Sequence, residues 1–457
     1  MAKSADSHAL LLKKSILFTT VKGFLCTFVF LKEEMTSMIS RSLYNIGMRG
    51  ALRGMKLLAY LPIHKTSPKW LRFIKGQSTA IEEIERTFSQ RTDTRPVIWV
   101  HAASLGEYAV VRPIIQALQA EKKWCIVLTF FSPTGYEALH QKHTDADYVF
   151  YLPWDTPAQA ERFLSVLRPV KALFAVSEYW VNYLQTLKRL QISTYLVSAI
   201  ITQKAPFFRW YGGIYKDALD AYTQIMVLNE SSEKLLRSIG FTRCKRMGDP
   251  LFDNAIRISQ TPYTDTVIKN FVQGEKVFIA GSTSDKQDLA LIAHLIQMHP
   301  EIRFIIVPHE VTKTALEETM HALPCKSVLY SQCRDTVSPQ ERVLIIDFIG
   351  ALAALYREAT WAYVGGGFTP YLHSIIEPVV YGIPVAFGPR IERKSTPMEL
   401  VERGIGTIVK TEEDLHHWFT ALKNDDNLLK AIHHKATTYV QTQAGATEAI
   451  IREITAV

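Results

Sequence analysis

The sequence lacks every cysteine pattern that would indicate a metal site or a disulfide framework. Its 457 residues include only five cysteines. They are scattered, and no two have Cys-x-x-Cys spacing, which is typical of a protein from a reducing compartment. The chain also lacks the P-loop, His-Glu-x-x-His and Gly-x-Ser-x-Gly motifs and the Gly-x-Gly-x-x-Gly fingerprint. Kinases, zinc hydrolases and dehydrogenases therefore lose their main support.

Long hydrophobic runs are also scarce. The best candidate, residues 15–31, is apolar but is broken by Lys22 and Gly23. A membrane-spanning helix needs about 20 apolar residues, so this run is short for one. It is a candidate monotopic anchor, a signal-like segment, or sequence upstream of a later start at Met35 or Met38. No small-residue cleavage pattern follows it, which argues against a cleaved signal peptide.

Acidic residues are rare in the first part of the chain. Residues 1–76 contain 13 Lys/Arg and 3 Asp/Glu, a balance of +10, and the remaining 39 and 41 give the rest −2, for +8 in all. The basic residues alternate with apolar and aromatic ones. This mixture favours a helix on an anionic membrane surface over a nucleic-acid-binding arm, so no nucleic-acid partner is expected. The alternative is a basic amphipathic helix packed on the protein itself.

Short apolar runs alternate with amphipathic stretches along the rest of the chain. Strand-like runs begin near residues 98, 124, 148, 172, 193 and 224, and again near 276, 302, 326, 342, 360 and 383. Regular alternation of this kind predicts an α/β protein with parallel sheets. A pause over residues 250–275 predicts a linker and hence two Rossmann-like domains with a cleft between them. Residues 411–457 are expected to be helical and to pack on the second domain or cross back to the first.

The expected organisation has three parts: a membrane-associating segment over residues 1–76, an N-terminal Rossmann-like domain over 77–255, and a C-terminal one over 256–457.

The stretch Val97–Gln116 reads as a buried strand, a tight turn and the start of a helix. Ligands bind at such turns in α/β proteins because free backbone N–H groups and the helix dipole meet there. Ser104 and Glu107 have the Ser-x-x-Glu spacing of a capping box, which is a purely structural role. Gly106 in the first turn suggests close approach of a ligand, and a carboxylate at a helix N-terminus can act as a general base. The spacing alone leaves both roles open for Glu107.

Aromatic residues follow strands in the same half. Trp154, Tyr179 and Trp180 are candidates for the wall of a sugar or acyl-chain pocket, and the alternative is that they belong to the domain core.

A second strand–turn–helix pattern lies in the other half. Gly365, Gly366 and Gly367 follow a strand and permit close backbone approach to a ligand. His373 and Glu377 stand at i, i+4 and are expected on one face of the following helix. A phosphate at that helix N-terminus and a ribose hydroxyl on Glu377 would fit this arrangement. The alternative is a glycine-rich turn beside an ordinary surface pair.

Three further loops are expected at the same sheet edge. Ser282 and Thr283 are predicted at a helix start, His309 just past a strand, and Gly350 at another helix start. Each alone is typical of a cap or a turn. Their coincidence at the ligand edge of one sheet is what favours a binding site.

The motifs, taken in order, resemble a known family. The series consists of HAASLGE, SPTGYE, YLPWD, the Glu-x-Trp-x-Asn of residues 178–182, MGDPLFD, AGSTSDKQD, the glycine turn and HSIIEP. It resembles the transferases that attach 3-deoxy-D-manno-octulosonic acid (Kdo) to the lipid A precursor, over roughly residues 40–440. The forms SAII, FFRWYGG and VPHE are most similar to Bacteroidetes-type members.

The resemblance implies a GT-B fold, CMP-Kdo as donor and an inverting displacement with no metal or cofactor, at the cytoplasmic face of the inner membrane. It implies that Glu107 deprotonates the 6′-hydroxyl of the lipid A glucosamine. Acceptor-side positions are His101, Ser104, Gly106, Glu178 and Trp180. Donor-side positions are Ser282, Thr283, Pro308, His309, Gly350, Gly366, Gly367, His373, Ser374 and Glu377.

The chain departs from the family pattern at several donor-side positions. Ser374 stands where the family has Asn, Ala351 where it has an acid, and Pro308-His309 where it has Pro-Arg-His. Ser198 and Ile200 replace a usual Asn and Arg. These differences keep two alternatives open: another GT-B nucleotide-sugar transferase or epimerase, and a non-catalytic homologue that binds lipid A or a nucleotide. Retention of Glu107 speaks against the second.

Overall fold

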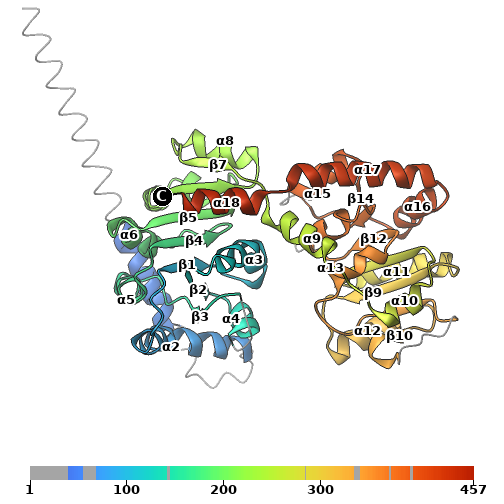
Figure 1. Ribbon diagram of the computed structural model, residues 1–457, viewed down its shortest axis with the longest axis horizontal. Coiled ribbons are helices and arrows are strands. Elements are labelled where there is room, and N and C mark those ends of the chain that lie inside the picture. The colour runs from blue at the N-terminus through green and yellow to red at the C-terminus, as the bar shows by residue number, and fades with distance from the viewer. Residues whose placement is uncertain are drawn as a thin grey trace, which may run out of the picture. The chain divides into compact units, whose positions relative to one another are not determined.

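The computed structural model describes residues 40–54, 68–140, 145–283, 285–333, 340–369, 372–391 and 395–456. The candidate anchor over residues 15–31 lies outside these ranges. The chain divides into two compact units (Figure 1). Unit 1 holds the described residues up to Met247 and those from Ile450 onward, and unit 2 is Gly248–Ala449.

Unit 1 is built on a seven-stranded parallel sheet in the order β3-β2-β1-β4-β5-β6-β7. The strands are β1 (Val97–His101), β2 (Cys125–Phe130), β3 (Tyr148–Tyr151), β4 (Lys171–Ala175), β5 (Ser193–Ala199), β6 (Gln224–Val227) and β7 (Cys244–Arg246). The helices are 40–54, α2 (Pro68–Ser89), α3 (Leu105–Ala120), α4 (Pro133–Leu139), α5 (Pro157–Leu167), α6 (Val181–Arg189), α7 (Gly213–Leu219) and α8 (Glu230–Ser238). A single 3₁₀ turn, η1 (Pro206–Phe208), precedes α7.

Unit 2 repeats this plan with the order β10-β11-β9-β8-β12-β13-β14, again all parallel. The strands are β8 (Val277–Thr283), β9 (Arg303–Pro308), β10 (Val328–Leu329), β11 (Val343–Ile345), β12 (Trp361–Val364), β13 (Val385–Phe387) and β14 (Gly406–Ile408). The helices are α9 (Pro250–Gln260), α10 (Thr266–Val272), α11 (Lys286–Met298), α12 (Lys313–Ala322), α13 (Leu352–Leu355), α14 (Ile376–Val379), α15 (Ser395–Glu402), α16 (Glu412–Lys423) and α17 (Asp426–Gln443). Two 3₁₀ turns, η2 (Tyr330–Gln332) and η3 (Tyr356–Glu358), complete it.

These two parallel sheets confirm the α/β fold with two Rossmann-like halves. The last helix, α18 (Ala446–Thr455), begins in unit 2 and ends in unit 1, where Ile450 and Ile454 are fully buried in the core. The C-terminal stretch is therefore helical, as expected, and its end crosses back to the first half.

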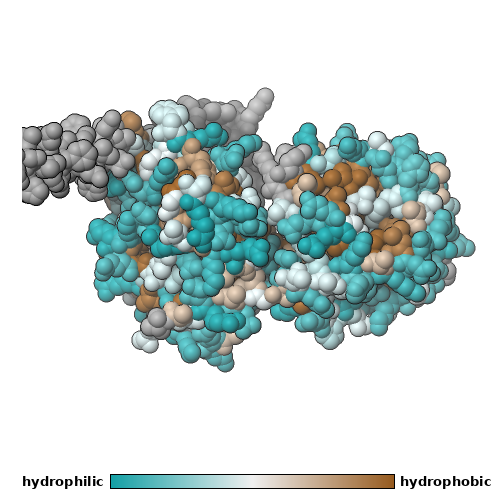
Figure 2. All heavy atoms as spheres, turned by 90° about the horizontal axis from the view of Figure 1, so that it is seen from above, coloured by the Kyte–Doolittle hydropathy of each residue, from teal (hydrophilic) through white to brown (hydrophobic). Residues whose placement is uncertain are grey.

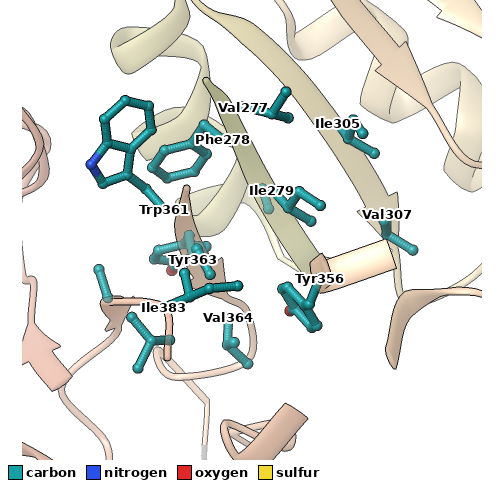
Figure 3. Packing of buried hydrophobic residues seen from close by; sticks show 14 of the residues in the cluster. Val277, Phe278, Ile279, Ile305, Val307, Tyr356, Trp361, Tyr363, Val364 and Ile383 are labelled. Atoms are coloured by element: carbon teal, nitrogen blue, oxygen red, sulfur yellow. The ribbon is translucent and has the colours of Figure 1, made fainter. Parts of the chain in front are cut away.

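The strands are apolar because helices cover both faces of each sheet. In unit 1 the two faces form two separate buried clusters, one with Trp99 and Phe174 and the other with Ile98 and Leu173. In unit 2, side chains from β8, β9 and β12 meet in one continuous core, part of which Figure 3 shows.

Nine of the helix starts in the described ranges can be read directly from the sequence. Their N-cap side chains accept a hydrogen bond from a backbone N–H of the first turn, which satisfies a donor that the helix leaves free. These caps are Ser104, Thr156, Asn229, Asp249, Asp265, Asp285, Thr312, Thr411 and Asp425.

Each sheet has a point where the strand order reverses. In unit 1, β1 lies between β2 and β4, and in unit 2, β8 lies between β9 and β12. Chain connections leave in opposite directions on the two sides of such a point, which opens a crevice at the carboxyl ends of the strands. The residues that follow β1, β4, β8 and β12 therefore occupy the positions where ligands bind in this kind of sheet.

Figure 2 shows one face, on which hydrophilic residues predominate and hydrophobic ones gather in several small patches. Within the described ranges, none of the helices has both the length and the apolar character to span a bilayer.

Candidate active site

Glu107 lies in the first turn of α3, directly after β1. Its backbone N–H donates to Ser104 Oγ (3.4 Å), and its Oε2 accepts from the Ser104 backbone N–H (3.2 Å). This is the capping box that the spacing predicts. Burial raises the pKa of Glu107, while backbone N–H groups of Ala103 and Ser104 act in the opposite direction. A raised pKa brings a carboxylate closer to the range that suits a general base at neutral pH. The cap and the base are thus compatible in one side chain.

His101 is the last residue of β1 and is completely buried. Its Nδ1 lies 2.9 Å from Thr129 Oγ1, which also accepts a hydrogen bond from Trp99 Nε1 (2.8 Å). Burial lowers the pKa of His101 to about 3, so the imidazole is neutral. Its Nε2 has no hydrogen-bond partner in the described part of the chain but lies 3.7 Å from Glu178 Oε2.

Glu178 follows β4 and is 6% exposed. Burial raises the pKa of its carboxyl group well above 4.5, and repulsion from the neighbouring Glu107 raises it further. Two nearby carboxyl groups rarely both ionise. Because Glu178 is the more deeply buried, we assign the proton to Glu178 and the negative charge to Glu107. The contact between His101 and Glu178 is then between two neutral groups, and not an ion pair.

The backbone before Glu178 is strained. Val176 has a φ of 63°, in the left-handed region that a β-branched residue rarely adopts. Its N–H donates to Val197 O (2.9 Å), and the Ser177 N–H then donates back to Ala175 O (2.8 Å). Such strain costs about 1–3 kcal/mol and is typical of functional sites. Here the kink ends β4 and turns the following segment, which carries Glu178, away from the strand direction.

Aromatic rings line this segment. The Trp180 ring centroid lies 5.9 Å from that of His101 and 5.0 Å from that of Phe131. The Phe131 ring also contacts Trp154 (5.8 Å). The Trp180 side chain also interacts with the Glu178 carboxyl group, and this interaction acts to lower the pKa that burial raises. The three predicted pocket aromatics are in part core: Trp154 is 7% exposed, whereas Tyr179 and Trp180 are half-buried.

In unit 2 the glycine turn follows β12 at the switch point. A Cβ on Gly365 would lie 2.3 Å from Ser282 O, and one on Gly367 would lie 2.5 Å from Gly388 N. Gly366 has a φ of 84°. No side chain fits at these positions. The backbone of the turn therefore packs directly against the backbone at the ends of β8 and β13.

Asp288 holds this turn in place and was not among the predicted site residues. It is fully buried in α11, its Oδ2 accepts from the Gly366 backbone N–H (3.0 Å), and its Oδ1 accepts from Tyr363 Oη (2.6 Å). Its position in the motif AGSTSDKQD was the only signal in the sequence. Its hydrogen-bond partners Tyr363 and Gly366, in and just after β12, lie 75 and 78 residues further along the chain. The burial of Asp288 therefore depends on a distant segment.

His309 and His373 meet beside the glycine turn. Their rings stack with centroids 4.2 Å apart and an interplanar angle of 29°. The backbone N–H of His309 donates to Thr283 O (2.9 Å), and the backbone N–H of His373 donates to Gly365 O (3.2 Å). The structure therefore brings together predicted donor-side residues from the ends of β8, β9 and β12.

Two placements from the sequence are wrong. His373 is not on the helix of Glu377, because α14 begins only at Ile376. Pro378 has no N–H to donate to the carbonyl of Ser374 and would clash with it, so a helix cannot start that early. Ser282 and Thr283 are also not at a helix start: they end β8, and α11 begins at Lys286. The helix begins directly after Asp285, because the carboxylate of Asp285 caps its first turn.

The remaining donor-side residues take separate positions. Pro308 ends β9 and pairs with Thr283. Gly350 has a φ of 105° and precedes α13 with open space around its Cα. Ser374 is exposed. Within the described ranges, no three His, Cys, Asp or Glu side chains gather in a way that could hold a metal ion.

Glu377 lies in the first turn of α14, and burial raises its pKa from 4.5 to about 7. Burial raises the pKa of Tyr356 well above 10, and the charge of Glu377 raises it further; Tyr356 Oη has no partner among the residues that the structure describes. Thr283 Oγ1 is likewise buried without a partner within those ranges. Two unsatisfied hydroxyl groups and a carboxyl group at the carboxyl end of one sheet are groups that a polar ligand can satisfy.

The raised pKa of Glu377 predicts a pH-dependent stability of unit 2. Between pH 4.5 and about 7 the folded state keeps a proton on Glu377 that the unfolded state has lost. Stability should therefore fall as pH rises through this window and level off above it. Glu377→Gln removes this contribution, so its melting temperature should fall less than that of the wild type between pH 5 and pH 7.5. Parallel melting curves for the two proteins would contradict the assignment.

Residues 81–254 match the family model described as 3-deoxy-D-manno-octulosonic-acid transferase, or Kdo transferase. The chain carries a Kdo transferase domain. That domain runs from α2 into α9 and contains His101, Glu107 and Glu178. The match confirms the family resemblance that the ordered motifs predict.

Relatives that align with both units of the chain agree with this match. The 3-deoxy-D-manno-octulosonic acid transferase of Chlamydophila psittaci is 24% identical over 73% of this chain and 80% of its own. The enzyme of the same name from Aquifex aeolicus is 26% identical over 73% of this chain and 88% of its own. That from Haemophilus influenzae is 23% identical over 78% and 85%.

Solved structures similar to this chain show the fold alone. A protein named as putative UDP-N-acetylglucosamine 2-epimerase from Listeria monocytogenes has a TM-score of 0.55 at 13% identity, over 79% of this chain and 95% of that one. Anabaena Alr3699/HepE in complex with UDP has a TM-score of 0.54 at 13% identity, over 78% and 97%. These likenesses, with the two seven-stranded parallel sheets, confirm the GT-B fold.

Proposed function

We propose that this protein transfers Kdo from CMP-Kdo to a hydroxyl group of the lipid A precursor, with Glu107 as the general base. The observation that carries the proposal is the pair formed by Glu107 and Glu178 at the switch point of a Kdo transferase domain. Glu178 keeps its proton and Glu107 stays ionised, so Glu107 can accept a proton from a substrate hydroxyl group.

In the proposed step the acceptor hydroxyl oxygen attacks the anomeric carbon of Kdo. Glu107 accepts the hydroxyl proton as the new C–O bond forms, and the bond from the anomeric carbon to the phosphate oxygen of CMP breaks. CMP leaves with that electron pair, and the configuration inverts. Ser104 keeps Glu107 in position through the capping box. The protonated Glu178 and the neutral His101 leave the charge on Glu107 without a second anion beside it.

The donor is proposed to bind at the switch point of unit 2. Backbone N–H groups of the glycine turn are suited to a phosphate because they approach a ligand without side-chain hindrance. Glu377, in the same unit, would accept from a ribose hydroxyl, and the buried hydroxyl groups of Thr283 and Tyr356 would find partners. The stacked imidazoles of His309 and His373 would border this site.

The acceptor is a lipid, and the proposal therefore includes an anionic membrane surface on the cytoplasmic side of the inner membrane. Support comes from the +10 balance of residues 1–76. Such segments bind anionic headgroups through electrostatic attraction and buried apolar area.

The test is an assay of the full chain with CMP-Kdo and a lipid A precursor. We expect CMP release and a product whose mass increases by whole Kdo units, with the same rate in the presence of EDTA. Parallel reactions replace CMP-Kdo with UDP-N-acetylglucosamine. Turnover of the UDP-sugar alone would favour the epimerase or another GT-B transferase. No turnover with any Kdo acceptor, in a protein that still binds CMP, would favour a non-catalytic homologue.

A further inference from the structure

A loop of unit 1 exposes two aromatic side chains to water. Trp210 is 96% exposed and Tyr211 is 52% exposed, and their rings contact each other edge to face at 5.5 Å. Trp210 is the most exposed of the large hydrophobic residues that the structure describes. Its neighbour Arg209, together with Lys204 and Lys216, is also exposed.

The loop is a preformed turn. The Arg209 N–H donates to Pro206 O (3.0 Å), and the Gly212 N–H donates to Arg209 O (2.9 Å). A Cβ on Gly212 would lie 2.3 Å from Pro206 O, so only glycine closes the turn. At its base, Phe207 is fully buried and its ring contacts that of Tyr179 (5.4 Å). The exposed tip is therefore held outward by a fixed backbone and has little entropy to lose when it binds.

Helix 40–54 lies beside this loop and also exposes apolar side chains. Leu43 is 63% exposed and Ile46 is 65% exposed. The helix is fixed on unit 1 through its other face: Tyr44 Oη donates to Asp155 Oδ2 (2.7 Å), and Asn182 Nδ2 donates to Asn45 Oδ1 (2.9 Å). The Tyr44 ring also contacts that of Tyr215 (6.4 Å) in α7, the helix that the loop leads into.

Both segments lie at the carboxyl edge of the sheet. The loop follows β5, and Asp155 and Asn182, which hold helix 40–54, follow β3 and β4. Glu107 follows β1 and opens at the same edge. We call the exposed residues Leu43, Ile46, Trp210 and Tyr211 the apolar rim.

The two segments that carry the apolar rim are basic, and the first acidic residue after the loop is Asp217 in α7. Residues 200–216 contain three basic residues and no acidic one, and so do residues 40–54. A second copy of the chain would have to bring two such positive surfaces together across a two-fold axis, which is unfavourable. Anionic headgroups are complementary to this charge. Tryptophan and tyrosine flanked by Lys and Arg are the residues that anchor proteins at the membrane–water interface.

We propose that the Arg209–Tyr211 loop is a membrane anchor that inserts Trp210 into the headgroup region of an anionic bilayer, with Leu43 and Ile46 beside it. The edge of the sheet that carries Glu107 then faces the lipid surface. This deepens the proposed function, because a lipid acceptor reaches the base without leaving the bilayer. The binding experiment below needs neither CMP-Kdo nor an acceptor, so its outcome is independent of whether Kdo transfer occurs.

The test is flotation of the full-length protein with vesicles of phosphatidylglycerol and phosphatidylethanolamine. The variant Trp210→Ala/Tyr211→Ala should partition roughly tenfold more weakly than the wild type. The matched control is Val170→Ala/Leu190→Ala, which removes two side chains of 46% and 42% exposure next to the starts of β4 and β5, at the opposite edge of the same sheet. Its partition should equal that of the wild type.

Equal partition of the Trp210→Ala/Tyr211→Ala variant and the wild type would overturn the proposal. A second readout uses vesicles with brominated acyl chains, which quench tryptophan fluorescence on contact. Wild type should lose more fluorescence than Trp210→Phe, and equal quenching would also overturn the anchor. Light scattering without vesicles identifies the competing occupant: if the double substitution dissociates a dimer and leaves vesicle binding unchanged, the loop binds a second copy instead.

Discussion

Glu107→Gln should lower the turnover number for Kdo transfer by about 10²–10⁴-fold, the range typical of a lost general base. Glutamine keeps the size of the side chain and can still accept from the Ser104 N–H, since Ser-x-x-Gln is also a capping box. The fold of α3 should therefore survive, and the melting temperature should stay near that of the wild type. The measurement is a steady-state rate of CMP release, with the melting temperature recorded on the same sample.

The chain offers a matched control in its second capping box. Thr411 Oγ1 accepts from the Asp414 N–H (3.1 Å), and Asp414 Oδ2 accepts from the Thr411 N–H (3.0 Å) at the start of α16. Asp414→Ala should cost about 1 kcal/mol of stability and leave turnover unchanged. If Glu107→Gln behaves like Asp414→Ala, with turnover preserved, then Glu107 is a cap and the proposed base must be given up.

Asp288→Ala should destabilise unit 2 strongly and weaken the binding of CMP. The substitution leaves the buried Tyr363 hydroxyl and the Gly366 N–H without an acceptor, at about 1–3 kcal/mol for each group. For a domain of this size that corresponds to a fall in melting temperature on the order of 10 °C. The glycine turn also loses the bond that fixes Gly366. Calorimetry should therefore show weaker CMP binding at a temperature where the variant is still folded.

Asp285→Ala is the control for this substitution on the same helix. Asp285 caps α11, where its Oδ1 accepts from the Gln287 and Asp288 backbone N–H groups (3.0 and 2.9 Å). Its loss should cost about 1 kcal/mol. The account of Asp288 fails if the two variants melt at the same temperature, or if Asp288→Ala binds CMP as tightly as the wild type.

Local signals were sufficient for several features of this protein. The apolar runs identified the strands because both faces of a parallel sheet are buried. Cap residues such as Ser104 and Asp249 marked helix starts because each satisfies a free backbone N–H. The Ser-x-x-Glu spacing predicted the capping box of Glu107, and the ordered motifs predicted the Kdo transferase family.

Helix boundaries near the donor side were predicted less well. The i, i+4 spacing of His373 and Glu377 suggested a shared helix face, but Pro378 prevents a helix from including both. His373 instead reaches its position through the stack on His309, a residue from another strand end. A periodicity within one segment carries no information about such a contact.

The sequence by itself determined the class of fold, the position of the acid after β1, and the resemblance to Kdo transferases. Only the tertiary structure decided the state of that acid. Glu107 and Glu178 follow different strands, and Glu107 raises the pKa of Glu178 because the order β2-β1-β4 places their strand ends side by side. Asp288 is likewise indistinguishable in the sequence from any other acidic residue of a helix, and its burial depends on packing against β12. Charge and burial depend on neighbours in space, and these are set by strand order, which no local pattern encodes.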